Sequence, residues 1–114
     1  MRIRFRSVNA NLPEGFEMDA HRKFERALLR TTDSVLKVFI IVTDINGPKG
    51  GVDKLCRVSV VLTHSRHLTL EERDANAHVA LARLAERTSR SVIRATKRTH
   101  ARESIRVVRF PESA

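Results

Sequence analysis

The chain has 114 residues, enough for one compact domain with an apolar core and too few for two ordinary domains. Its 22 Lys and Arg outnumber its 13 Asp and Glu, and the net charge of +9 predicts an anionic partner such as nucleic acid or an acidic membrane surface. One cysteine excludes an internal disulfide, and the longest apolar run, 38–42, is too short for a signal peptide or a membrane span, so we expect a cytoplasmic protein.

The first two predicted elements are a strand and a helix. Residues 2–6 alternate arginine with apolar side chains, which predicts a half-buried strand at about 2–8 with Ile3 and Phe5 facing inward. A helix over about 17–31 is predicted from an apolar stripe that recurs at helical spacing. The stripe consists of Phe16, Ala20, Phe24, Ala27 and Leu28.

A long antiparallel hairpin is predicted next. Residues 35–43 and 55–63 are rich in β-branched side chains, and the sequence Asn-Gly-Pro-Lys-Gly-Gly at 46–51 separates them. This segment lacks the Gly-Lys-Ser/Thr and the helix start of a phosphate-binding loop, so a hairpin connection is favoured over a nucleotide site. Cys56 alternates with Val58 and Val60 in the second strand, which predicts a core cysteine.

The last predicted elements are a short strand at 67–71 and a helix at about 75–99, with Asp74 as the capping residue. At 100° per residue, one side of this helix is apolar and the opposite side is basic. The apolar side contains Ala77, Leu81, Leu84, Ala85, Val92 and Ala95. The basic side contains Arg83, Arg87, Arg90, Arg94 and Lys97.

The element order βαβββα predicts an α+β fold, a two-layer sandwich in which two helices pack on one face of a four-stranded sheet. We expect a domain at 1–99 and a C-terminal tail at 100–114, within which 104–110 could form a fifth strand or a mobile arm. Phe39, Ile41 and Val61 are expected on the other sheet face, covered by the tail or by a partner.

The basic sides of the two predicted helices are the main functional signal. On the first helix, Arg22, Arg26 and Arg30 recur every four residues, opposite the apolar stripe. Residues 83–98 contain six cations and one acid, Glu86. Like charges at these spacings repel unless an anion neutralises them, so a phosphate-binding surface is favoured over a solvated face. Both rows are expected to face solvent on the same side of the domain.

Two further arrangements are weaker candidates. His64 and His67 would point to opposite faces of a strand and have no supporting ligand nearby, so neither a metal site nor a cofactor is expected. Arg94 with His100 resembles a pairing found in some all-helical ribonucleases, but no second acid or base is evident, so we do not expect an enzyme. A small ribonuclease and a general double-stranded-RNA-type domain remain alternatives.

Three stretches carry a resemblance to a known family. They are NGPKGGVDKLCRVSV at 46–60, EERDANAHVALA at 71–82, and the spacing of Arg87, Arg90 and Arg94. Together they resemble the ribosome hibernation-promoting factor and ribosome-associated inhibitor family, which includes cold-shock proteins of the protein Y type. That family commonly has an acid where this chain has Asn76 and a tyrosine where it has His78.

The resemblance implies a domain that binds the small ribosomal subunit and its ribosomal RNA, in the channel used by messenger RNA and by A- and P-site transfer RNAs, and blocks translation under stress. It implies no membrane partner, no small-molecule substrate, a monomer off the ribosome, and a short form without the C-terminal dimerisation domain of long members. The RNA-facing residues that it implies are Arg22, Lys23, Arg26, Arg30, Arg83, Arg87, Arg90, Arg94 and Lys97.

Overall fold

The computed structural model describes residues 1–45 and 53–113, with the backbone alone from residue 98 onward. The predicted turn at 46–51 therefore lies outside the described residues, and the rest confirms the βαβββα order of an α+β fold. The elements are β1 (Arg2–Val8), α1 (Phe16–Ala27), the 3₁₀ helix η1 (Leu29–Ser34), β2 (Val35–Asp44), β3 (Lys54–Leu62), β4 (Arg66–Asp74) and α2 (Ala77–Ser113).

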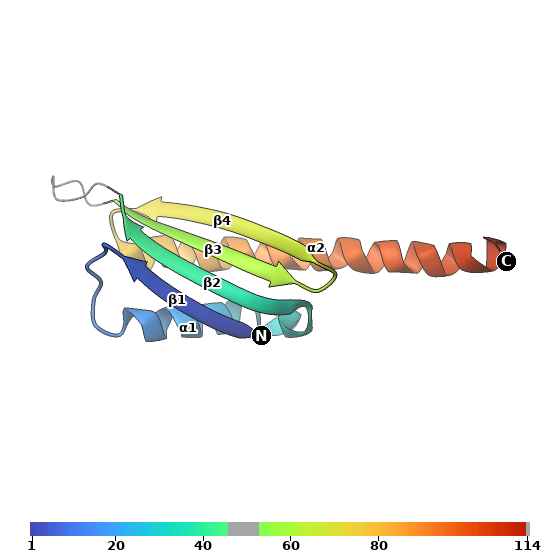
Figure 1. Cartoon of the computed structure of the whole chain (residues 1–114), viewed down its shortest axis with the longest axis horizontal. Helices are drawn as coiled ribbons and strands as arrows, with labels where there is room; N and C mark the ends of the chain where they lie inside the picture. Colours follow the sequence, from blue (N-terminus) through green and yellow to red (C-terminus); the bar gives the residue numbers. More distant parts are fainter. Residues whose placement is uncertain (46–52, 114) are drawn as a thin grey trace.

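The four strands form one sheet in the order β1-β2-β3-β4. The pair β1 and β2 is parallel, and the other two pairs are antiparallel, as predicted for the hairpin. A parallel pair needs a crossover connection, and α1 with η1 supplies it. Both helices lie on the same face of the sheet (Figure 1), which confirms the two-layer arrangement.

The core forms between this sheet face and the two helices. In the strand register, Phe5 pairs with Ile40, Ile40 with Val58, and Val58 with Leu70, so one apolar row crosses all four strands. The six apolar residues predicted on the last helix are all buried against the sheet. The predicted burial of Cys56 is also confirmed.

The first helix is shorter than predicted, because α1 ends at Ala27 and not near residue 31. The Thr31 and Thr32 hydroxyls donate to the Leu28 carbonyl oxygen at 3.4 and 3.2 Å. Side chains that bond this carbonyl compete with the regular helical hydrogen bonds, and the chain continues as the 3₁₀ helix η1. Arg30 consequently lies in η1 and not in α1.

The second helix starts later and ends later than predicted. Strand β4 extends to Asp74, so α2 begins at Ala77. The helical backbone then continues to Ser113, and the suggestion of a fifth strand at 104–110 is wrong. The C-terminal part of α2 extends past the end of the sheet (Figure 1), and the molecule is 66 Å long.

Burial gives Cys56 a testable chemical property. Removal from water raises the pKa of its thiol from 9.0 to about 11, because burial disfavours the thiolate. The contribution of this shift to stability is therefore present below pH 9 and is lost as the pH rises through about 11.

We expect the folded protein to react slowly with an aromatic disulfide reagent at about pH 8, since the thiolate is the nucleophile. Unfolding in guanidinium should restore one rapidly reacting thiol per chain. Reaction can be followed by the absorbance of the released thiol. Equal rates in the folded and unfolded protein would contradict the buried position of Cys56.

Candidate nucleic-acid interface

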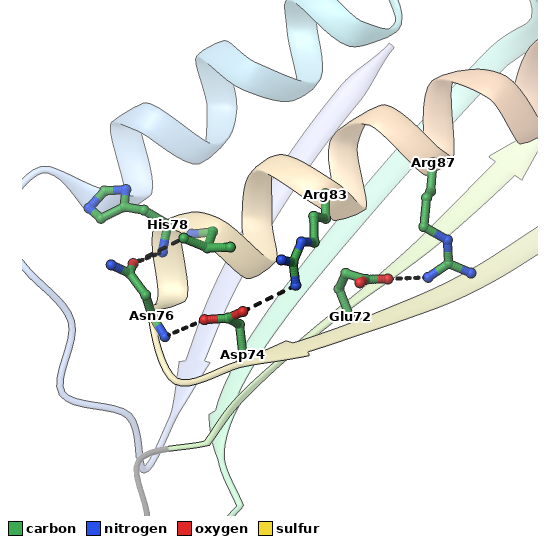
Figure 2. Close-up of polar contacts among 7 residues, drawn as sticks. Glu72, Asp74, Asn76, His78, Arg83 and Arg87 are labelled. Atoms are coloured by element: carbon green, nitrogen blue, oxygen red, sulfur yellow. Dashed lines mark hydrogen bonds and ion pairs between the residues drawn. The ribbon is translucent and has the colours of Figure 1, made fainter.

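The entry into α2 is fixed by Asn76. Its Oδ1 accepts hydrogen bonds from the backbone N–H groups of His78, at 2.9 Å, and Val79, at 3.4 Å (Figure 2). These groups have no partner within the helix, so Asn76 is the capping residue. The prediction that Asp74 caps the helix is wrong, because Asp74 still belongs to β4 and instead accepts the Asn76 backbone N–H at 2.9 Å.

His78 fixes the start of α2 against the start of α1. The centroid of its ring lies 4.9 Å from that of Phe16, with the rings tilted by 55°. Phe16 also meets Phe5 of β1, with ring centroids 5.8 Å apart. The three rings therefore connect β1, α1 and α2 at one end of the domain, and His78 supplies an aromatic contact at the position where the resembling family commonly has tyrosine.

Arg83 and Arg87 both point toward β4 (Figure 2). The Arg83 guanidinium lies 3.1 Å from an Asp74 carboxylate oxygen. Arg87 forms an ion pair with Glu72 and donates to the Glu71 backbone oxygen at 2.8 Å. The two arginine side chains remain 56% and 46% exposed, so these pairs contribute little stability and leave the guanidinium groups accessible.

Sequence reasoning missed the two acids because they belong to another element. It treated the repulsion along α2 as a sign that an external anion must be present, but β4 supplies two carboxylates. One signal could have found them. Leu68, Leu70, Glu72 and Asp74 alternate at period two, which places both acids on the helix-facing side of a longer strand.

The other cations predicted on α2 have no such partners. Arg90, Arg94 and Lys97 are exposed and form no ion pair with any residue that the structure describes. Residues seven apart lie about two turns along a helix and point in nearly the same direction. By this spacing Arg94 follows the direction of Arg87 and Arg90 follows that of Arg83, whereas Lys97, seven residues after Arg90, lies closest to the outward side of α2.

The cations predicted on the first helix are also exposed. Arg22, Lys23 and Arg26 lie on α1, and Arg26 is in its last turn, where positive charge suits the helix dipole. Arg30 is exposed in η1, beyond the end of α1 at Ala27, so the helical spacing of four is interrupted.

The structure brings these residues onto the helix side of the domain, because α1 and α2 are neighbours on one sheet face. It does not gather them into a single ridge. Arg83 and Arg87 turn to the β4 edge, away from α1 (Figure 2). The cationic surface is consequently broad, extends from α1 across α2 to β4, and includes the acids of β4.

A largely buried ion pair lies at the end of the sheet where β2 ends and β3 begins. Lys54 is 8% exposed, and its Nζ lies 2.9 Å from an Asp44 carboxylate oxygen. Lys54 faces the helices together with Cys56 and Val58 of the same strand. This pair neutralises a cation in the core layer and removes Lys54 from the set of candidate RNA ligands.

Other candidate chemistry has little support in the geometry. The described ranges contain no group of three His, Cys, Asp or Glu residues that could hold a metal ion. His64 lies in the turn between β3 and β4, and His67 is exposed on β4. The side chain of His100 lies outside the described part of the chain. No helix in the described residues is long and apolar enough to cross a membrane.

Two solved structures have the same fold. One is the N-terminal domain of Protein Y from Thermus thermophilus, with a TM-score of 0.68 and 21% identity over 82% of this chain and 98% of that one. The other is a ribosomal subunit interface protein from Coxiella burnetii, with a TM-score of 0.72 and 11% identity over 85% and 99%. No family model and no curated protein matches the sequence. The fold that the family resemblance implied is confirmed.

The Asn76 cap leads to a prediction about stability. Asn76→Ala should lower the free energy of unfolding by about 1 kcal/mol, because two backbone N–H groups lose their acceptor. Asn76→Asp should keep most of the stability, since a carboxylate is an equally good acceptor. Urea unfolding measures both variants, and Asn11→Ala, at an exposed loop position, is the matched control. An unchanged midpoint in Asn76→Ala would contradict the capping role.

Proposed function

We propose that this protein binds the small ribosomal subunit in the channel of messenger and transfer RNA and blocks translation in the cytoplasm. One observation carries the proposal: exposed cations extend over the helix side of a fold shared with a Protein Y domain and a ribosomal subunit interface protein. The proposed RNA ligands are Arg22, Lys23, Arg26, Arg30, Arg83, Arg87, Arg90, Arg94 and Lys97.

The chemistry of these side chains suits RNA phosphates. Seven of the nine are arginines, whose planar guanidinium donates paired hydrogen bonds to phosphate oxygens. Arg90, Arg94 and Lys97 can bind a phosphate without breaking any described ion pair. Inhibition by occupancy requires no nucleophile, metal or cofactor, so the proposal is for a non-enzymatic RNA-binding regulator.

The ion pairs with β4 add a feature to this proposal. In the free protein Asp74 and Glu72 neutralise Arg83 and Arg87, and on binding the two guanidinium groups exchange these carboxylates for RNA phosphates. Exposed pairs of this kind are weak, so the exchange costs little. The two acids thus weaken the binding of any anion to Arg83 and Arg87, RNA phosphates included, and leave the guanidinium groups accessible.

The unpaired arginines of α2 provide the first test. Arg90→Glu combined with Arg94→Glu should weaken binding to purified small subunits at least about 100-fold, because several phosphate contacts become repulsive. Both residues are exposed, so thermal unfolding should be nearly unchanged. The double lysine variant at the same positions is the matched control and should keep most of the affinity. Wild-type affinity in the glutamate variant would refute the proposed surface.

The carboxylate exchange provides the second test. Glu72→Gln should tighten binding to small subunits about threefold, since Arg87 no longer has to leave an ion pair. Glu14→Gln is the control, because it changes the net charge equally at an exposed loop position. If both variants bind with the same affinity, the effect comes from net charge and the proposed exchange is wrong.

Competition experiments distinguish the channel from general binding to duplex RNA. Transfer RNA and messenger RNA bound to small subunits should displace the protein, and a free RNA duplex should compete poorly. Affinity for the free duplex equal to that for the subunit would instead support a general double-stranded-RNA-binding domain.

A further inference from the structure

The sheet face opposite the helices is strongly basic. Six cations point outward from its four strands, and one acid, Glu71, accompanies them among the described residues. The cations are Arg2, Arg4, Arg6, Lys37, Arg57 and Arg73. Glu71 lies 3.4 Å from Arg57 and neutralises only that residue. Both helices lie on the other side of the sheet (Figure 1), and no described element covers this face.

The cations are concentrated at β1 and β2. Arg2, Arg4 and Arg6 alternate with buried positions of β1, so neighbouring arginines on the face are about 6.6 Å apart. In the parallel register Arg2 lies opposite Lys37, and Arg4 lies opposite Phe39. The repeat along β1 is comparable to the separation of successive phosphates along an extended nucleic-acid strand.

A small hollow lies where these two strands meet. It has a volume of about 90 Å³ and is lined by Arg2, Arg4, Lys37, Val38 and Phe39. Three cations therefore surround a site next to a half-buried aromatic ring. A phosphodiester group fits the charge of the hollow, and Phe39 offers a flat apolar surface on which one neighbouring base can stack.

We propose that this outer sheet face is a second RNA-binding surface, which holds an extended single strand with phosphates on Arg2, Arg4 and Lys37 and one base on Phe39. Contacts of this kind are independent of base sequence. The proposal goes beyond the binding of the small subunit through the helices, because it assigns a partner to the opposite face. A domain that is basic on both faces can be held between two RNA segments.

The geometry favours RNA over an acidic peptide. Peptides that bind sheets commonly add a strand to an exposed edge and insert alternate side chains into apolar pockets. The cations here lie on the face of the sheet and not along its edge. Ile41 and Val61, at the centre of this face, are half-buried. An RNA backbone needs only positive charge at regular intervals together with an occasional stacking platform.

The test uses a fluorescently labelled, unpaired RNA of mixed sequence and about 12 nucleotides, with binding measured by anisotropy. The triple variant Arg2→Ala, Arg4→Ala and Lys37→Ala should weaken binding at least about tenfold and reduce the salt slope by about two units. The control variant Arg22→Ala, Arg26→Ala and Arg90→Ala also lowers the net charge from +9 to +6, and its loss should be smaller. A loss in the sheet variant no greater than in the control would overturn the proposal.

A second variant tests the base contact without changing charge. Phe39→Leu should weaken binding to the same RNA about fivefold and leave the salt slope unchanged, because stacking is lost and the phosphate contacts remain. Thermal unfolding monitors the fold of each variant. Unchanged affinity in a folded Phe39→Leu protein would show that no base stacks there and would refute that part of the proposal.

Two further measurements separate the possible outcomes. A labelled poly-glutamate peptide of similar charge should bind weakly. If the peptide binds as tightly as the RNA, the proposed RNA partner is wrong and an acidic protein is the better assignment. Small-subunit binding depends on Arg90 and Arg94 whether or not the outer face contributes. Suppose that Arg90→Glu with Arg94→Glu abolishes subunit binding, but the triple variant of the sheet binds the oligonucleotide as tightly as the wild type. That result would refute the second surface and leave the proposed subunit binding intact.

Discussion

The structure depends on the apolar contact between one face of the sheet and two helices. Strand residues at period two and helix residues at period 3.6 meet there, and the row from Phe5 to Leu70 extends this contact across the four strands. Fully burying an aliphatic or aromatic side chain contributes about 1.5–3 kcal/mol, so this layer is the main source of stability. Because only one sheet face is used, the charged residues are left on two opposite outer surfaces.

The two surfaces differ in how their charge is balanced. On the helix side, β4 contributes Glu72 and Asp74, which neutralise Arg87 and Arg83. On the outer sheet face, Glu71 is the one acid among the described residues, and it is paired with Arg57. In the proposed complexes the helix side therefore exchanges some of its internal partners for an anion, whereas the cations of β1 bind one directly. Salt should weaken binding at both surfaces, since phosphate contacts are proposed for each.

Periodicity predicted the four strands, the two helices and the buried residues, because burial is what imposes periods of two and 3.6. It could not predict where α1 ends, which depends on the Thr31 and Thr32 hydroxyls competing for the Leu28 carbonyl. Nor could it predict the partners of Arg83 and Arg87. Those ion pairs depend on how β4 lies beside α2, and no local pattern encodes that contact. The sequence thus showed the cations of the proposed interface without the acids that accompany them.

Asn76 and His78 keep the start of α2 in place, although they differ from the residues that the resembling family commonly has there. Asn76 caps the helix as an acid would, and His78 supplies an aromatic ring to Phe16 as a tyrosine would. The neutral amide of Asn76 also adds no negative charge beside Asp74, so the Asp74 carboxylate alone faces Arg83 at this end of α2. Asn76 thus caps α2 without adding a negative charge to the surface on which the exchange at Arg83 is proposed.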